Sequence, residues 1–249
     1  MVDKTALVVD AAPGVYEKVL SLLEGETPGR ALDAPAGEGA FSLELAERGY
    51  EVKAADLNRE KFKAEGIACD LVDLNKTLPY EDAFFDAVIC IEGIEHLENP
   101  HHLVREFRRV LKSGGTLMLT TPNILNVYSR LRFLLFGSAD RLHSEMDSFK
   151  GNLYQLLRRH INPVGYPELK YILEQNGFGV EKIATNASVV SYRGGRFVLR
   201  LFLPAVFLML GGLVRLVAGS FRKKDSLSGV LYSPELLYGE TLILKTRKR

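Results

Sequence analysis

Short apolar runs alternate with amphipathic segments from residue 12 to about residue 120, and this order constrains the fold more than any single motif. The apolar runs predict strands over residues 31–34, 50–56, 66–70, 85–91 and 116–121. The amphipathic segments predict helices over residues 13–23, 41–48 and 99–112, with a short polar helix that ends near residue 64. Strands that alternate with helices in this way form a parallel sheet with helices on both of its faces.

Several helices carry recognisable end signals. Asn99 and Pro100 are a typical cap and first turn for the third long helix. The expected buried face of the second helix consists of Phe41, Leu43, Leu45 and Ala46. Farther along, residues 167–178 predict a helix with a glycine stop and residues 179–183 a strand. Residues 241–246 predict a last strand that closes the sheet.

In such sheets, ligands bind in the crevice at the carboxyl ends of the strands, near the point where the strand order reverses. Polar residues stand at most of these ends. The residues expected around this crevice are Asp33, Asp56, Asp73, the segment Ile91 to His96 and the segment Thr121 to Asn123. We therefore expect one ligand site formed by these strand ends.

The turn at residues 36–39, after the first strand, is where such folds bind a nucleotide. Its glycines and Ser42 make an incomplete dinucleotide fingerprint, with Asp56 spaced as a ribose ligand would be. A pyrophosphate at this helix N-terminus would lie close to Asp33 and Glu38, with little water to screen the repulsion. S-adenosylmethionine has no phosphate and presents an ammonium and a sulfonium group. The charges thus favour S-adenosylmethionine, and a nicotinamide-dependent dehydrogenase is the alternative.

Four segments resemble the class I S-adenosylmethionine-dependent methyltransferases in order and spacing. They read L-D-A-P-A-G-E-G, A-A-D-L-N, D-L-N-K-T-L-P-Y-E-D-A-F-F-D-A-V-I-C-I-E-G-I-E-H-L and R-V-L-K-S-G-G-T-L-M-L-T-T-P-N. The resemblance covers residues 28–123 and implies a Rossmann-like α/β fold. In that fold, seven mostly parallel strands carry helices on both faces, and the last strand is antiparallel. Pro35 departs from the family pattern, which commonly has glycine there, so this turn is expected to approach the ligand differently.

For the methionine end of the cofactor, the resemblance implies contacts with Asp33, Ala36 and Gly37. Gly39, in the same turn, and Ile91, at the end of the fourth strand, are assigned to the same cofactor site.

For the adenosine end, the resemblance implies that Asp56 accepts hydrogen bonds from both ribose hydroxyls and that Leu57 packs on the adenine. Asp73 would accept a hydrogen bond from the exocyclic amine, and Leu74 would supply a backbone contact. Asp70 is an alternative to Asp73, because both follow the third strand.

Methyl transfer to a hydroxyl requires alignment of the acceptor with the sulfonium and removal of one proton. His160 is the preferred candidate for the general base, and His96 is the second candidate. Glu92, Glu95 and His96 have a spacing that brings them to one face if a helical turn follows the fourth strand. With His160 they resemble a divalent-metal site of certain RNA and quinone O-methyltransferases. The alternative, which we favour, is a metal-free structural turn.

The segment from residue 183 to residue 224 has an unusual composition. Its basic residues are Arg193, Arg196, Arg200, Arg215, Arg222, Lys223 and Lys224, and it contains no acid. The whole chain has a net charge of +1, so this segment contributes +7 and the remainder −6. The uncharged stretch 201–214 is shorter than the roughly 20 residues needed to span a bilayer. Residues 195–224 therefore predict a buried lid, a homodimer face or a contact with an anionic membrane surface.

These observations predict one methyltransferase domain over residues 1–249, with a substrate-side lid at 123–166 and an apolar, basic insertion at 185–235. The expected reaction is O-methylation of a small hydrophobic or lipid-linked metabolite. A non-catalytic S-adenosylmethionine-binding scaffold and an RNA methyltransferase are the alternatives. A nucleic acid partner is not expected, because the net charge of +1 provides no overall attraction. With two cysteines and no signal-peptide pattern, the expected location is cytoplasmic or peripheral to the inner face of the membrane.

Overall fold

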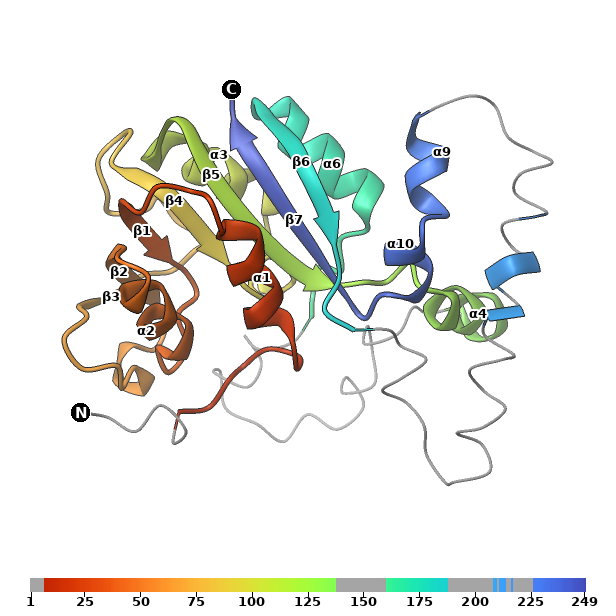
Figure 1. The fold of residues 1–249 in the computed structure, drawn as a ribbon, viewed down its shortest axis with the longest axis horizontal. Helices are drawn as coiled ribbons and strands as arrows, with labels where there is room; N and C mark the ends of the chain where they lie inside the picture. Colours follow the sequence, from red (N-terminus) through yellow and green to blue (C-terminus); the bar gives the residue numbers. More distant parts are fainter. Residues whose placement is uncertain (1–6, 138–159, 188–207, 210, 214–215, 217–225) are drawn as a thin grey trace.

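The computed structural model describes residues 7–137, 160–187 and 226–249, together with residues 208–209, 211–213 and 216. The described residues form a seven-stranded sheet in the order β3-β2-β1-β4-β5-β7-β6 (Figure 1). The strands are β1 (Arg30–Asp33), β2 (Glu51–Asp56), β3 (Cys69–Leu71), β4 (Phe85–Cys90), β5 (Leu111–Pro122), β6 (Phe178–Ala184) and β7 (Thr241–Lys248). β7 is antiparallel to both of its neighbours, β5 and β6, so the other strands share one direction. The predicted fold class is confirmed.

Each face of the sheet is covered by its own helices and has its own apolar core. The helices are α1 (Val15–Leu23), α2 (Ala40–Glu47), α3 (Pro100–Val110), α4 (Val127–Phe136), α6 (Tyr166–Gln175), α9 (Ser226–Leu231) and α10 (Pro234–Tyr238). α1 and α2 pack on one face, and α3 and α6 pack on the other. Consecutive strand residues alternate between the two cores, as Ala31 and Leu32 show. The central strands therefore carry buried apolar residues on both of their sides, as expected for a parallel sheet covered on both faces.

α3 is the clearest amphipathic helix of the described residues. The Asn99 side chain caps it by accepting a hydrogen bond from the His102 N–H at 2.9 Å, and Pro100 occupies its first turn. Leu103 and Phe107 are fully buried against the sheet. Burial of each such side chain contributes about 1.5–3 kcal/mol. The prediction of this helix and its cap is confirmed.

The predicted boundaries need correction at two places. The polar helix expected to end near residue 64 is a single 3-10 turn, η2 (Arg59–Lys61). It has no buried residue, so no packing surface sustains further turns. The third long helix ends at Val110 instead of at residue 112, and Leu111 pairs with Phe85 in the sheet. Gly114, at φ 73°, allows β5 to turn back into register after this first pair.

The predicted buried face of α2 is partly wrong. Phe41 and Leu45 are buried, but Leu43 is half-buried and Ala46 is exposed. Ser42 is fully buried in their place, because its hydroxyl donates a hydrogen bond to the buried Asp33.

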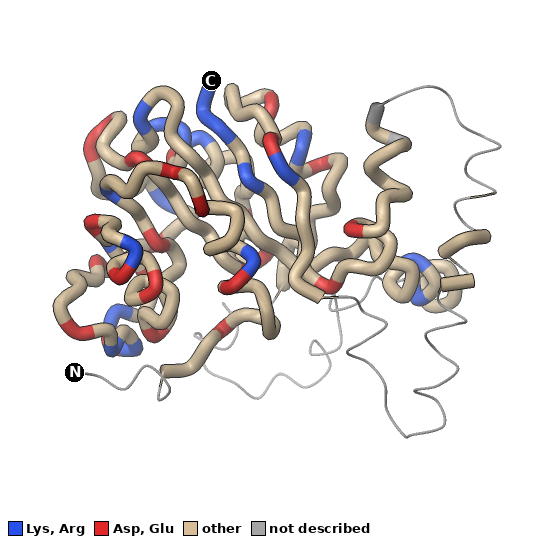
Figure 2. The backbone as a smooth tube through the Cα atoms, viewed as in Figure 1, with Lys and Arg blue, Asp and Glu red and all other residues tan. Residues whose placement is uncertain are grey.

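At one end of the molecule, α4, α9 and α10 extend beyond the sheet (Figure 1). Asn123, just after β5, fixes this extension by donating hydrogen bonds from Nδ2 to the carbonyls of Leu236 and Gly239, both at 2.9 Å. Charged residues of both signs surround the sheet, whereas the extension carries few of them (Figure 2). None of the described helices is long and apolar enough to cross a membrane.

Candidate active site

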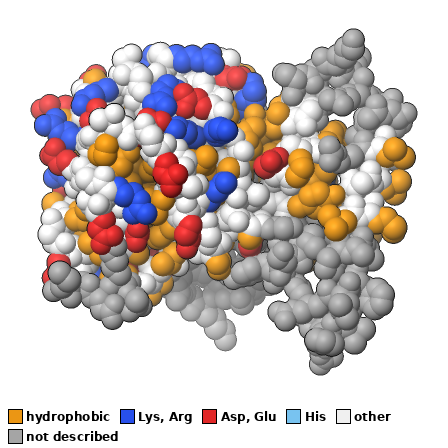
Figure 3. All heavy atoms as spheres, viewed as in Figure 1, with side chains coloured by type: hydrophobic (Ala, Val, Ile, Leu, Met, Phe, Trp, Pro, Cys, Tyr) orange, Lys and Arg blue, Asp and Glu red, His pale blue; other side chains and the backbone are white. Residues whose placement is uncertain are grey.

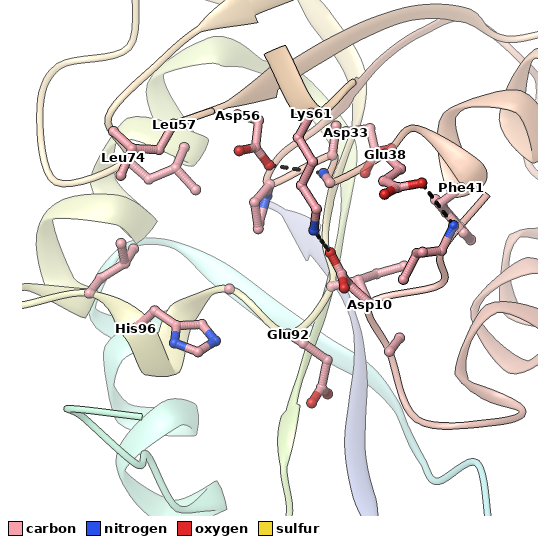
Figure 4. A pocket seen from close by; sticks show the side chains of 18 of the residues that line it. Asp10, Asp33, Glu38, Phe41, Asp56, Leu57, Lys61, Leu74, Glu92 and His96 are labelled. Carbon is pink, nitrogen blue, oxygen red and sulfur yellow. Dashed lines mark hydrogen bonds and ion pairs between the residues drawn. The ribbon is translucent and has the colours of Figure 1, made fainter. Parts of the chain in front are cut away.

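A cavity of about 510 Å³ lies at the carboxyl ends of β1, β2 and β4 (Figure 4). Most of the residues predicted for the cofactor and for catalysis line it. They are Asp33, Ala36, Gly37, Asp56, Leu57, Asp73, Leu74, Ile91, His96 and His160. Gly39 does not line the cavity but precedes α2 as its N-cap residue, and Glu95 is buried just behind the wall.

The turn after β1 depends on its two glycines. Gly37 and Gly39 have φ values of 56° and 91°, in the left-handed region that side chains disfavour. A Cβ atom on Gly39 would also lie 2.6 Å from both Ala64 Cβ and Phe62 Cε2. The Ala34–Pro35 peptide bond is cis, and the Pro35 ring packs against Gly93 in the turn that follows β4. Pro35 thus joins two strand-end turns that both border the cavity.

Asp33 ends β1 and is only 1% exposed. Its Oδ2 accepts a hydrogen bond of 2.6 Å from the Ser42 hydroxyl. Burial raises the pKa of Asp33 to about 7, with a smaller upward contribution from the charge of Asp56, while the Ser42 hydrogen bond opposes the rise. A cationic ligand at this turn would favour the ionised form of Asp33.

Glu38 lines the same turn, but its carboxylate already has partners. It accepts a hydrogen bond from the Val8 N–H at 3.0 Å and forms an ion pair of 2.9 Å with Lys63. These contacts lower the pKa of Glu38. The sequence presents Glu38 and Asp33 as two equivalent acids beside the turn. In the structure, Glu38 binds the N-terminal segment, and Asp33 is the acid that is buried at the turn, where its hydrogen bond comes from the Ser42 hydroxyl and not from a cation.

Sequence reasoning missed the N-terminal segment as a wall of the cavity. Residues 8 and 10–13 line it, and Asp10 forms an ion pair with Lys61 of η2 (Figure 4). Farther along, the Asn186 side chain donates a hydrogen bond to the carbonyl of Pro13 at 2.9 Å. No periodic pattern precedes α1, so the sequence offers no signal for these contacts.

Asp56 and Asp73 occupy the cavity wall from neighbouring strand ends. The Asp56 carboxylate accepts hydrogen bonds from the N–H groups of Gly37, at 2.9 Å, and Asn58, at 2.8 Å. Each carboxylate oxygen keeps a further lone pair that a hydroxyl could use. Asp70, the alternative to Asp73, does not line the cavity and accepts a hydrogen bond from the Tyr80 hydroxyl at 3.1 Å.

The segment after β4 differs from the regular helical turn that the sequence suggested. Glu92 has a left-handed backbone with φ 48°, and its Oε1 accepts a hydrogen bond from the Thr120 hydroxyl at 3.2 Å. The 3-10 turn η3 (Ile94–His96) begins only after Gly93. Because Glu92 precedes this turn, it does not share a face with Glu95 and His96.

The residue that does join Glu95 and His96 is His160, which lies 64 positions beyond His96 in the sequence. The imidazole rings of His96 and His160 are 4.9 Å apart between centroids, at 65° to each other. Glu95, His96 and His160 each offer one ligand atom within 4.8 Å of the others. The described residues therefore contain a mixed carboxylate–imidazole cluster beside the cavity, with Glu92 outside it.

The segments predicted as lids contribute little to the described cavity wall. Of residues 123–166, His160 alone lines the cavity among those that the structure describes. The described residues of 185–235 do not line it. Residues 138–159 and most of 195–224 lie outside the described residues, so the lid and the insertion stay predictions.

Comparisons with known proteins agree with this geometry. A family model described as a methyltransferase domain matches residues 11–183. Over 105 residues the chain is 31% identical to the ubiquinone biosynthesis O-methyltransferase of Psychrobacter cryohalolentis, covering 38% of this chain and 41% of that protein. It is 29% identical over 117 residues to the corresponding protein of Idiomarina loihiensis, covering 42% of this chain and 48% of the relative. The chain thus matches less than half of the length of these curated relatives.

The fold is also found in solved structures. A SAM-dependent methyltransferase from Archaeoglobus fulgidus superposes with a TM-score of 0.56 at 20% identity, and the match covers 94% of each chain. The family model covers well over half of the residues. The chain therefore belongs to the class I S-adenosylmethionine-dependent methyltransferases, and S-adenosylmethionine is the cofactor that this family implies.

Proposed function

We propose that this protein methylates a hydroxyl oxygen of a small hydrophobic or lipid-linked metabolite. The observation that carries the proposal is the pair of imidazoles, His96 and His160, that faces the same cavity as the acidic cofactor turn. The matched segments of the ubiquinone biosynthesis O-methyltransferases support transfer to oxygen.

In this reaction the acceptor oxygen attacks the methyl carbon, the carbon–sulfur bond breaks, and S-adenosylhomocysteine leaves as a neutral thioether. The hydroxyl proton passes to an imidazole. His160 is the proposed general base, and His96 packs edge-to-face against it. The buried Glu95 lies behind them, with its Oε1 4.0 Å from Nε2 of His96, so a carboxylate stands beside the pair of imidazoles that receives the proton.

The decisive test compares His160→Gln with His101→Gln across a panel of phenolic, catecholic and lipid alcohols. S-adenosylhomocysteine release is the readout. His101 lies in the first turn of α3 and does not line the cavity, so it is a matched control. We expect His160→Gln to lower kcat by about a hundredfold or more, with the affinity for S-adenosylhomocysteine unchanged, and His101→Gln to retain the wild-type rate.

Two results would contradict the proposal. An unchanged kcat in His160→Gln would exclude this histidine as the base. Cofactor binding without turnover across the whole panel would instead favour the non-catalytic binding protein.

The cluster of Glu95, His96 and His160 favours a second candidate, a metal-assisted O-methylation. Two imidazole nitrogens and one carboxylate oxygen suit Zn²⁺ or Mn²⁺, and other positions would remain for an acceptor. A bound cation would orient a vicinal diol or catechol and lower its pKa. In this case Glu95 and the two histidines would hold the ion, and Glu92 would not.

Calorimetric titration with Zn²⁺ and Mn²⁺ separates the two candidates without an acceptor. The metal-assisted reaction requires one tight site in the wild type, loss of that site in Glu95→Gln, and loss of turnover with a chelator. General-base catalysis alone predicts no tight site and turnover that is insensitive to the chelator.

A further inference from the structure

Two segments far apart in the sequence expose large apolar side chains at the same end of the molecule. In the last turn of α4, the exposed fractions of Phe133, Leu134, Leu135 and Phe136 are 61%, 79%, 63% and 76%. The second segment consists of the described residues between 208 and 216. There, the exposed fractions of Leu208, Met209, Leu213 and Leu216 are 55%, 70%, 54% and 76%. We call these eight residues the apolar end. Hydrophobic side chains gather on the described part of that end of the molecule (Figure 3).

Both segments are attached to the same pair of short helices, α9 and α10. From α4, Arg130 donates a hydrogen bond of 2.6 Å to the carbonyl of Leu231, and its guanidinium lies 5.3 Å from the Tyr232 ring centroid. From the second segment, the carbonyl of Leu208 accepts a hydrogen bond of 3.5 Å from the Tyr238 hydroxyl. The two exposed segments are therefore anchored at the same end of the molecule, through the same pair of helices.

Monomeric proteins rarely leave so many large apolar side chains exposed together unless that surface binds a partner. The amino-acid sequence on either side of the second segment indicates the partner's chemistry. Residues 183–224 contain seven basic residues and no acid. An apolar surface within a basic segment suits an interface with acyl chains below and anionic headgroups around it.

We propose that the apolar end docks on the surface of an anionic membrane without crossing it. A second copy of the chain fits less well. A symmetric dimer through this surface would bring the same patch of both copies together, and with it two basic segments of like charge. An anionic surface compensates that charge instead.

Docking of the apolar end also bears on the proposed function, because it would bring a lipid-linked acceptor near the active site. This link to the acceptor rests on the proposed function, whereas the docking itself does not. Asn123 ties the end of β5 to α10, and Glu240, one residue after Gly239, lines the active-site cavity. The helix α10, to which the apolar end is attached, is therefore followed within two residues by a residue of the cavity wall. A lipid-linked acceptor held in the membrane could reach the cavity without leaving the bilayer completely.

The chain contains no tryptophan, which permits a direct test of docking that needs no acceptor. Leu134→Trp places a single fluorophore at the most exposed side chain of α4. Leu71→Trp, at a side chain 66% exposed on the edge strand β3, is the matched control. We expect phosphatidylglycerol vesicles to shift the emission of Leu134→Trp to the blue, phosphatidylcholine vesicles to do so less, and salt to weaken the effect.

A second pair of variants tests the energetic contribution of the surface. Leu134→Ser with Phe136→Ser should lower the vesicle partition coefficient by about tenfold or more, because two apolar side chains no longer insert. Leu71→Ser with Tyr171→Ser, also at exposed positions, should leave it unchanged.

Three results would overturn the proposal. They are no shift of Leu134→Trp with anionic vesicles, an equal shift of Leu71→Trp, and a blue shift without lipid that grows with protein concentration. The last would assign the surface to a second copy. Failure of the proposed function would appear separately, as vesicle binding without methyl transfer to any acceptor in the panel.

Discussion

At the scale of single residues, the acids of the cavity have different electrostatic roles although the sequence presents them alike. Asp33 is fully buried with one hydroxyl partner, Glu38 is paired with Lys63, and Asp56 holds two backbone N–H groups. The carboxylate whose protonation is most sensitive to its surroundings is therefore Asp33. This difference can be tested without an acceptor.

Asp33→Asn should remove a pH dependence of stability in the cofactor-free protein. The pKa of Asp33 is about 7 in the folded protein against an ordinary value of 3.8, so between these values the folded state holds one more proton than the unfolded state. The contribution of Asp33 to the free energy of unfolding is fully present below the unfolded pKa and is lost as the pH rises through the folded pKa. Asparagine is neutral at every pH.

Chemical denaturation from pH 5 to pH 8 provides the measurement. Relative to the wild type, we expect Asp33→Asn to gain about 2–3 kcal/mol over this range. A difference between the two proteins that stays constant with pH would show that Asp33 is ionised throughout.

The neighbouring acids Asp73 and Asp70 provide a matched pair for the adenosine end. Asp73 lines the cavity, whereas Asp70 bonds to Tyr80 outside it. We expect Asp73→Ala to lower the affinity for S-adenosylhomocysteine by about tenfold, because it removes one hydrogen bond to a charged group. Asp70→Ala should leave the affinity, measured by calorimetry, unchanged. The opposite order would move the adenine contact to Asp70, the alternative that the sequence leaves open.

At the scale of elements, the spacing of apolar residues predicts the helices and strands whose formation depends on neighbouring residues in the sequence. The alternating strands and helices and the Asn99–Pro100 cap of α3 are confirmed, because apolar spacing and cap chemistry act over a few residues. The left-handed backbone of Glu92 is not visible in this way. It depends on Thr120, which is 28 residues distant and bonds both the backbone N–H and the side chain of Glu92. The same holds for the approach of His160 to His96.

The contact between the turns after β1 and β4 makes Gly93 a sensitive position. A Cβ atom there would lie 2.5 Å from Pro35 Cδ and 3.0 Å from Cys90 Sγ. Since Pro35 lies in a packed turn and Cys90 ends the buried strand β4, neither can move easily. We therefore expect Gly93→Ala to destabilise the protein by about 1–3 kcal/mol and to weaken cofactor binding. The measurements are thermal unfolding and calorimetry.

Gly165→Ala is the control for this substitution. Gly165 precedes α6 without a positive φ, and a Cβ atom there would meet its nearest neighbours at 3.7 Å, an ordinary contact. Equal destabilisation by the two variants would show that the turn contact is not the cause.

At the scale of the whole molecule, the sheet brings together strand ends that are far apart in the chain, and this is why the sequence could place most of the cavity. Parallel strands bring Asp33, Asp56 and Asp73 to one edge once their order is given. The part of the cavity wall formed by residues 8 and 10–13, the N-terminal wall, cannot be predicted from the order of the strands, because these residues belong to no strand. The Asp10–Lys61 ion pair joins residues 51 positions apart in segments without apolar periodicity, so neither partner indicates the other.

This N-terminal wall should slow cofactor release, which gives a prediction for the molecule as a whole. Residues 8–13 are held by Glu38, by Lys61 and, across the sheet, by Asn186. Partly exposed ion pairs contribute about 0.2–1 kcal/mol, so Asp10→Ala should accelerate S-adenosylhomocysteine dissociation by about threefold. Stopped-flow displacement measures the rate. Glu51→Ala, which breaks the exposed 3.3 Å pair with Arg30 away from the cavity, should leave the rate unchanged. Equal rates in Asp10→Ala and the wild type would mean that the cofactor leaves by a path that the N-terminal segment does not obstruct.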